Sequence, residues 1–305
     1  MVNLTEDGNH TTVQDLVCKP HFSGTNQNII VSTLNALLAF TAFLGNVLII
    51  VALPKVSSLH SPSKLLLGCL ATTDLCVGLI TQPIYVNFLL SPENSRRCYY
   101  SVILSNVMGS IFCGVSLLTS TAISVDRLLA LLLGLRYRHV VTLRRMRTLA
   151  AAIWLSSTAL AIILLFNIPA ALFIICISML LCIVTSAFCY TKIYLKLRLH
   201  QTQVQGHVHQ GQSNGGVIKL NIARYRKTVF TSLWVQITLV VCYLPYFTVT
   251  IFVLTGLLAK FIDLAWGVAI SFVMFNSSLN PFLYCWMMRD VRQAMKNTIK
   301  QLWFF

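Results

Sequence analysis

Charged side chains are scarce in this sequence of 305 residues, and acidic ones are the scarcest. Aspartate, glutamate, lysine and arginine together make up 10% of the chain, whereas 56% of it is hydrophobic. A soluble domain carries about 25% charged residues, because its surface must be covered by groups that water solvates. The composition therefore predicts that a lipid bilayer surrounds most of the chain.

Motifs that would indicate an enzyme, a zinc module or a disulfide framework are also lacking. The ten cysteines form no CxxC pair. The apolar stretches contain no serine–histidine, paired-aspartate or HExxH arrangement, and the histidines lie in loops and tails. We therefore expect a protein that is not an enzyme and that holds no cofactor, apart from the ion considered below.

Seven apolar runs are each long enough to cross a bilayer, which takes about 20 residues of α-helix. They are residues 29–53, 64–90, 100–133, 148–166, 170–196, 229–257 and 264–286. The sequence therefore predicts an all-α fold, with a seven-transmembrane-helix bundle over residues 29–286. A transporter would show repeated halves and several ionisable side chains near the midplane. Neither pattern is present, so a transporter is a much weaker hypothesis.

The basic residues predict how these spans are oriented. If the N-terminus lies outside, the outer side carries only four of the 23 lysines and arginines, namely Lys19, Arg96, Arg97 and Lys260. Glycosylation sequons at Asn3 and Asn9 independently favour an extracellular tail over residues 1–28. We expect a multi-pass plasma-membrane protein with a cytoplasmic C-terminus. Its net charge of +15 would then face anionic lipid and a cytoplasmic partner rather than nucleic acid.

Two segments on the predicted cytoplasmic side have distinctive compositions. Residues 199–221 include a polar run rich in glycine and glutamine, which predicts a flexible third intracellular loop. Residues 287–305 alternate basic side chains with an apolar stripe of Val291, Met295, Ile299 and Leu302. We expect this last segment to form a short amphipathic helix that lies on the inner leaflet and binds membrane lipids.

Asp74 lies near the middle of the second predicted span, where a carboxylate costs about 2.5–3.5 kcal/mol. Five residues are candidate partners for it: Asn46, Ser116, Asn276, Ser277 and Asn280. Hydroxyls, amides and one carboxylate offer oxygen ligands that suit Na⁺ or an ordered water cluster. The residues alone leave open a hydrogen-bond network that only packs helices.

Further polar and helix-breaking residues mark the ends and bends of the spans. Asp126 and Arg127 close the third span, and Pro245 and Pro281 lie inside the sixth and seventh. Each proline removes a backbone hydrogen bond and kinks its helix, which gives that helix two alternative packings.

Short motifs follow one another in a fixed order in successive spans. They are Gly45-Asn46, LATTD ending at Asp74, SVDR ending at Arg127, Trp154, Tyr190, Cys242-x-x-Pro245, and Asn280-Pro281-Phe282-Leu283-Tyr284. Each motif is weak alone, but the ordered set resembles the rhodopsin-like (class A) G-protein-coupled receptor family over essentially the whole chain. The loop at 135–145 resembles the adenosine and melanocortin branches, and the very short connection at 167–169 resembles the melanocortin and cannabinoid branch.

This resemblance implies a function and assigns roles to residues. Members of the family bind an extracellular ligand and activate heterotrimeric G proteins when the sixth helix moves outward. The group around Asp74 matches the family's sodium pocket, which makes Asp74 a candidate ligand of an allosteric Na⁺. The residues that match positions of activation and G-protein coupling are Asp126, Arg127, Tyr190, Tyr243, Pro245, Pro281 and Tyr284.

The resemblance also places a ligand pocket in the outer half of the bundle. The residues that it points into this pocket are Gln82, Tyr85, Asn106, Gly109, Cys113, Phe247, Trp266 and Ile270. Gly109 stands where amine receptors carry an aspartate, and Met274 stands where opsins carry the retinal lysine. Such a pocket suits a neutral or lipid-like small molecule. Glu93 and Asp263 at the rim leave a cationic peptide open as the alternative.

Several positions depart from the family pattern. Leu128 follows the Asp-Arg pair in place of tyrosine, and Tyr243 replaces the tryptophan of the sixth span. These departures keep open a receptor-like decoy or scaffold that does not signal. Cys98 lies about one helical turn too far from Arg127, so the residues leave open either a disulfide between Cys98 and Cys18 or a free thiol at Cys98.

Overall fold

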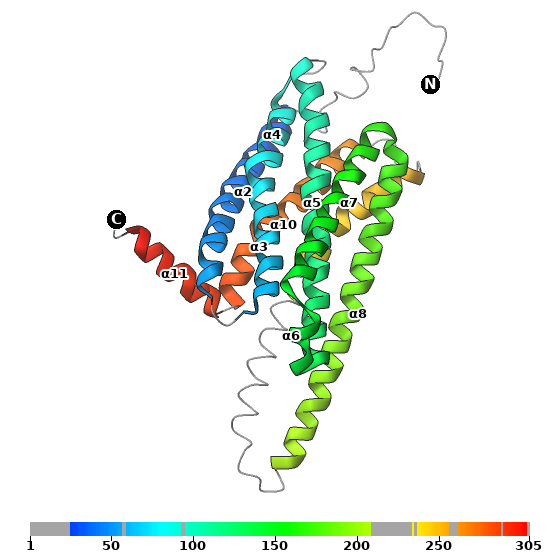
Figure 1. The fold of residues 1–305 in the computed structure, drawn as a ribbon. Helices are drawn as coiled ribbons and strands as arrows, with labels where there is room; N and C mark the ends of the chain where they lie inside the picture. Colours follow the sequence, from blue (N-terminus) through cyan, green and yellow to red (C-terminus); the bar gives the residue numbers. More distant parts are fainter. Residues whose placement is uncertain are drawn as a thin grey trace, which may run out of the picture.

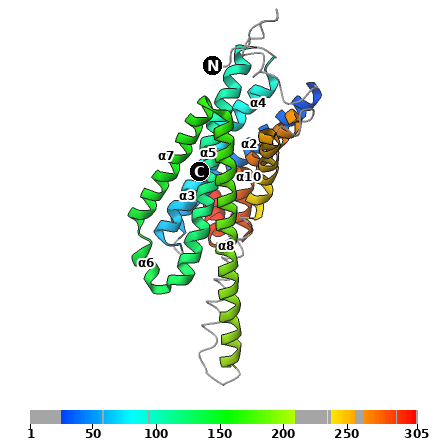
Figure 2. The same ribbon diagram turned by 90° about the vertical axis from the view of Figure 1, so that its right-hand side faces the viewer.

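Helices make up the regular structure of this computed structural model, which describes residues 25–56, 59–92, 95–208, 234, 237–255, 262–287 and 289–303. The elements in chain order are α2 (Thr25–Ala52), η1 (Leu53–Lys55), α3 (Ser61–Cys76), η2 (Val77–Thr81), α4 (Gln82–Leu90), α5 (Arg96–Leu133), η3 (Gly134–Arg136), α6 (Tyr137–Val140), α7 (Leu143–Phe166), α8 (Ile168–Val208), the sixth span Ile237–Thr255, α10 (Ile262–Met287) and α11 (Arg289–Trp303). Within these residues, seven helices are long and apolar enough to cross a membrane. They lie side by side in one elongated bundle (Figures 1 and 2). The predicted all-α fold with seven spans is confirmed.

The fifth helix extends beyond its predicted end. The apolar run predicted that this span ends at residue 196, but α8 continues to Val208 and projects past the end of the bundle (Figure 1). Residues 199–208, predicted as the start of a flexible loop, are therefore helical. Leucine, glutamine and arginine are good helix formers, so a polar composition alone does not end a helix. The remainder of the predicted loop, residues 209–221, lies outside the described residues.

The second span is continuous but changes its winding in the middle. A π-helical turn at Val77–Thr81 separates α3 from α4, and the backbone N–H of Gln82 donates to the carbonyl of Val77, five residues earlier. Pro83 follows directly and has no N–H to donate, which explains why the regular ladder is interrupted here. The same turn contains Gly78, where a Cβ would lie 3.0 Å from the Ala39 carbonyl oxygen of α2. The irregular turn therefore lies where two helix backbones approach closely.

Gly45 allows an even closer approach between α2 and α10. A Cβ at this position would lie 2.6 Å from Pro281 Cβ and 2.7 Å from Pro281 Cγ. We expect Gly45→Ala to lower the midpoint of thermal unfolding of the purified protein, because overpacking of this kind costs about 1–3 kcal/mol. Gly68→Ala is the matched control, since its Cβ would meet Leu53 Cδ2 at an ordinary 3.6 Å. Equal midpoints for the two variants would contradict this account of the interface.

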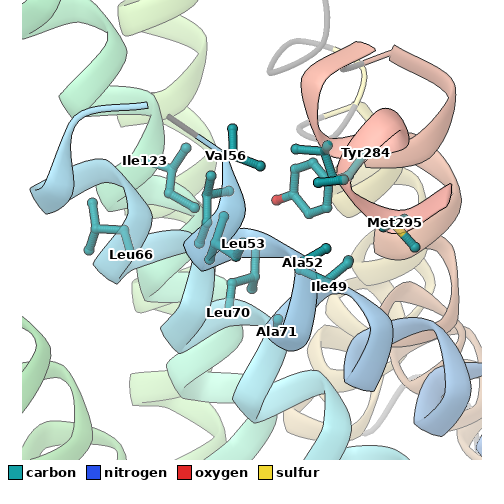
Figure 3. Close-up of a cluster of buried hydrophobic side chains, with 13 residues drawn as sticks. Ile49, Ala52, Leu53, Val56, Leu66, Leu70, Ala71, Ile123, Tyr284 and Met295 are labelled. Carbon is teal, nitrogen blue, oxygen red and sulfur yellow. The ribbon is translucent and has the colours of Figure 1, made fainter. Parts of the chain in front are cut away.

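A buried apolar cluster joins α2, α3, α10 and α11 at one end of the bundle (Figure 3). Tyr284 of α10 lies inside it, facing Val56, and Met295 of α11 packs beside Ile49 and Ala52. Lys55 of η1 also contacts α11, because its Nζ donates to Thr298 Oγ1 (3.0 Å) and to Gln301 Oε1 (2.8 Å). This end also carries Arg127, and we call it the Arg127 end.

The predicted amphipathic helix is present as α11, but its apolar stripe divides between two environments. Val291 and Met295 are buried against the bundle, whereas Ile299 is 39% exposed. The side chain of Leu302 is outside the described part of the chain. The first half of the stripe therefore docks on α2, and an apolar side chain further along remains available to a membrane surface. Contact with the inner leaflet stays a prediction.

Candidate functional site

The carboxylate of Asp74 is buried where three helices meet. Ser116 Oγ of α5 donates to Asp74 Oδ1 at 3.2 Å, and Asn280 Nδ2 of α10 donates to Asp74 Oδ2 at 2.7 Å. Asp74 itself is fully buried. The Ser277 hydroxyl is a third hydrogen-bond partner, so three of the five predicted partners contact the carboxylate directly. A buried carboxylate held by three neutral donors keeps capacity for a further donor or a cation.

The other two predicted partners, Asn46 and Asn276, do not hydrogen-bond to the carboxylate. Asn46 Nδ2 donates to the carbonyls of Ala42 (2.8 Å) and Ser277 (3.1 Å), which ties α2 to α10. Three amide oxygens have no hydrogen-bond partner among the described residues: Asn46 Oδ1, Asn276 Oδ1 and Asn280 Oδ1. Buried acceptors without donors cost about 1–3 kcal/mol each. The residues present therefore fit water or a small cation better than a closed network of side chains.

Asp126 is held by two hydroxyl groups at the Arg127 end. Tyr137 Oη donates to Asp126 Oδ1 at 2.6 Å, and Ser63 Oγ donates to Asp126 Oδ2 at 2.8 Å. Gly134 has a φ of +51°, which lets the chain reverse direction after α5. This reversal brings Tyr137 back to Asp126. The carboxylate is 1% exposed, so each hydroxyl replaces water that the buried group has lost.

Sequence reasoning did not identify Ser63 or Tyr137 as site residues. Ser63 lies beside Pro62 in the sequence, and Tyr137 belongs to the connecting loop at 135–145. A hydroxyl residue near a helix end carries no signal that distinguishes a cap from a contact with a distant helix. A buried acid that needs donors is the clue that could have prompted a search for them.

The other residues predicted to act in activation lie along neighbouring helices of this end. Ser124 Oγ donates to Tyr190 Oη at 3.1 Å, which connects α5 to α8 one helical turn before Arg127. Tyr284 is buried in the apolar cluster of α2, α3, α10 and α11 (Figure 3). Arg127, Tyr190 and Tyr284 therefore come from three helices but belong to the same end of the bundle.

Tyr243 connects the sixth span to α5. Its side chain is buried, and its Oη donates to the backbone carbonyl oxygen of Cys113 at 3.1 Å. Pro245 lies two residues further along the sixth span. The bond therefore holds the sixth span to α5 next to the place where proline weakens its backbone ladder.

A cavity of about 370 Å³ lies beside Tyr243, between α5, α7, α8, the sixth span and α10. Five of the eight residues predicted for a ligand pocket line it: Asn106, Gly109, Cys113, Trp266 and Ile270. No charged side chain of the described residues is among its lining. An uncharged lining excludes recognition through an ion pair with the described walls and favours a neutral ligand.

The other three predicted pocket residues do not line this cavity. Gln82 and Tyr85 are buried on α4, and no residue of α4 lines the cavity. Tyr85 Oη instead donates to the carbonyl oxygen of Gly267 at 3.2 Å, which ties α4 to α10. Phe247 packs against the apolar cluster around Leu239. The role of these three residues in a ligand pocket stays a prediction.

Cys98 is disulfide-bonded, so the alternative of a free thiol there is wrong. Its backbone N–H also donates to Ser95 Oγ at 3.1 Å, which caps the start of α5. Cys18 lies outside the described residues, as do the sequons at Asn3 and Asn9. The pairing of Cys98 with Cys18 and the glycosylation of both asparagines therefore stay predictions.

Comparison with known proteins gives a match over most of the chain. The family model for the 7 transmembrane receptor (rhodopsin family) matches residues 45–170 and 167–284. Melanocortin receptor 4 of Danio rerio is 27% identical over 292 residues, which cover 90% of this chain and 85% of that relative. This relative comes from the melanocortin branch, one of the three branches that the sequence motifs and connections resemble.

Proposed function

This chain belongs to the rhodopsin family of seven-transmembrane receptors, and we propose that it binds an extracellular ligand and activates heterotrimeric G proteins. The family consists of receptors, so the expectation that the chain is not an enzyme is confirmed. The seven spans and the family also make it a multi-pass membrane protein. The coupling to G proteins, the orientation and the ligand are the proposal.

The observation that carries the proposal is the order of sites along α5. Cys113 lies at the cavity, Ser116 binds Asp74, Ser124 binds Tyr190, and Arg127 closes the series. At about 1.5 Å per residue, Cys113 and Arg127 are roughly 21 Å apart along the helix. One rigid element therefore runs from a ligand-sized cavity through a polar network to the face where a partner would bind.

We propose that the Arg127 end is cytoplasmic and the cavity end extracellular. Basic residues support this orientation, because the connection after α5 carries Arg136 and Arg138, and α7 begins with Arg144 and Arg145. The described connection at the other end of α7 is Asn167 alone, which has no charge. The plasma membrane is the location that fits a receptor for an extracellular ligand.

The ligand proposed for the cavity is a neutral or lipid-like small molecule. The uncharged lining supports it. The name of the Danio rerio relative points instead to a melanocortin, and the predicted acidic rim would favour a cationic peptide. Of that rim, Glu93 and the side chain of Asp263 lie outside the described residues. The described wall therefore favours the neutral ligand.

Sodium is the proposed ion at Asp74. The support is chemical, because a single buried carboxylate lies near unpartnered amide oxygens, and a monovalent cation would satisfy both. We propose that Na⁺ stabilises the closed arrangement. A ligand in the cavity would stabilise the arrangement in which the sixth span swings outward about Pro245.

We expect Tyr243→Phe to raise ligand-free signalling by about 2- to 10-fold. The change removes one neutral hydrogen bond, worth about 0.5–1.5 kcal/mol, that ties the sixth span to α5 in the closed arrangement. The measurement is nucleotide exchange on a G protein at matched receptor amounts. Tyr194→Phe is the control, since Tyr194 is 55% exposed on α8. Unchanged exchange in Tyr243→Phe would remove this bond from the mechanism.

The alternative is a receptor-like decoy or scaffold, favoured by Leu128 and Tyr243 at two positions of the family's switches. A G-protein-dissociation assay in cells, run against a broad ligand panel, separates the two. The proposed receptor shows dissociation that Arg127→Ala abolishes at equal surface expression. Surface-expressed protein with no dissociation, with or without ligands, across the G-protein subtypes would favour the decoy.

A further inference from the structure

The cavity does not lie only along the axis of the bundle. Part of its wall comes from the side of α5 that faces α7, through Ser110 and Gly114, and from α7 itself, through Leu160 and Leu164. Gly114 lets α5 and α7 approach closely beside this wall, because a Cβ there would lie only 3.1 Å from Ser157 Oγ of α7. One arm of the cavity therefore extends between α5 and α7 toward the outer surface.

The wall of this arm reaches the surface at the junction of α7 and α8. Leu165 and Ile168 both line the cavity, and they are 54% and 60% exposed. Leu165 is the next-to-last residue of α7 and Ile168 is the first residue of α8, and both helices are long and apolar enough to cross a membrane. Exposed apolar side chains on such helices face lipid chains rather than water. The cavity and the lipid-facing surface therefore share these two side chains.

The connection between α7 and α8 has too little chain to cover this place. It consists of Asn167, whose N–H donates to the Ile163 carbonyl (2.8 Å) and whose Oδ1 accepts from the Ala170 N–H (3.1 Å). These bonds close the end of α7 and cap the start of α8. Figure 2 shows the two helices meeting directly at the edge of the bundle. The described connection between α7 and α8 therefore contains no loop that could act as a lid.

The lining also restricts what can enter from this side. It combines apolar side chains with uncharged polar ones such as Asn106, Ser110 and Tyr246. A single-chain lipid already dissolved in the bilayer would exchange one apolar environment for another and could bond its head group to these polar atoms. A charged head group would lose its solvation without gaining an opposite charge, which costs several kcal/mol.

We propose that the cavity opens sideways into the bilayer between α7 and α8, beside Leu165 and Ile168, and admits an uncharged single-chain lipid through this opening. The inference rests on the proposed function only in taking the cavity as the ligand site. It adds the class of ligand and its route of entry. A ligand of this kind reaches the cavity at a rate set by its concentration in the membrane.

Trp266 in the cavity wall provides the readout. The full chain is placed in lipid nanodiscs, and its tryptophan fluorescence is measured. The fluorescence of Trp266 is obtained by subtracting the fluorescence of the Trp266→Phe variant under the same conditions. The probes are a monoacylglycerol, a phosphatidylcholine and a free fatty acid that carry the same brominated chain. We expect the monoacylglycerol to remove most of the Trp266 fluorescence. The zwitterionic phosphatidylcholine and the anionic fatty acid should produce only the weaker quenching that comes from the surrounding bilayer. Equal quenching by all three overturns the inference.

The route is tested by narrowing the opening. We expect the double variant Leu165→Phe/Ile168→Phe to slow the onset of quenching about tenfold, which is a barrier of about 1.4 kcal/mol. Leu155→Phe is the matched control, because Leu155 is 72% exposed on α7 and does not line the cavity. An unchanged onset in the double variant, with the thermal unfolding midpoint preserved, overturns the route.

The same nanodiscs separate this inference from the proposed function. Nucleotide exchange on an added G protein is measured beside the quenching. Normal exchange without selective quenching overturns the sideways opening and leaves the receptor function intact. Selective quenching without exchange overturns the proposed signalling and leaves the lipid site intact.

Discussion

Asp74→Asn should abolish the stabilisation of this protein by sodium. The variant keeps the shape of the side chain and an oxygen that accepts from Asn280 or Ser116, but it removes the charge that would hold a cation. A ligand that binds only the folded state at 100 times its Kd adds about 2.7 kcal/mol. The measurement is the thermal unfolding midpoint in NaCl against choline chloride at equal ionic strength.

Asp74→Ala is expected to behave differently from Asp74→Asn. It leaves Ser116 Oγ and Asn280 Nδ2 buried without their acceptor, which costs about 1–3 kcal/mol for each group. Its midpoint should therefore fall in both salts. Asp290→Asn controls for a general effect of charge, since Asp290 is exposed on α11. A sodium shift that persists in Asp74→Asn would place the ion elsewhere.

Removing both hydroxyls from Asp126 should destabilise the protein strongly. The double variant Ser63→Ala/Tyr137→Phe deletes the donors at 2.8 and 2.6 Å and leaves a buried carboxylate without them. Hydrogen bonds to a charged group contribute about 1.5–3 kcal/mol each, so we expect a loss of about 3–6 kcal/mol if the two add. The midpoint of thermal unfolding of the purified chain, with each single variant alongside, measures this loss.

A third substitution tests whether the charge of Asp126 causes that loss. Adding Asp126→Leu to the double variant removes the carboxylate that has lost its donors, and most of the lost stability should return. The control is Tyr100→Phe, which deletes a tyrosine hydroxyl from a side chain that is 67% exposed. If the double variant melts like the parent, the Asp126 contacts do not hold α3 and α6 to α5.

The sequence predicts the bundle well because each span carries its own signal. Apolar length alone located seven helices, and the single carboxylate in the second span predicted the contacts that Ser116 and Asn280 make with Asp74. A buried charge must find partners inside the bundle, so its presence predicts a network even before the partners are positioned.

The sequence of a single span does not predict features that depend on how two helices meet. The approach of Gly45 to Pro281 and the return of Tyr137 to Asp126 join residues whose own segments give no signal of the contact. The same limit applies to Gln82 and Tyr85, which do not line the cavity, because the sequence does not show which helices enclose it. The end of α8 was missed for another reason, since polar residues can continue a helix once it has started.

The central claim is that this chain is a receptor that activates G proteins through the Arg127 end. The most direct measurement is nucleotide exchange on a purified heterotrimeric G protein by the purified chain in nanodiscs, tested across the G-protein subtypes. We predict exchange above that of empty nanodiscs, raised by Tyr243→Phe and lost in Arg127→Ala of equal thermal stability. Exchange equal to empty nanodiscs for the folded chain and for Tyr243→Phe, with every subtype, would contradict the claim.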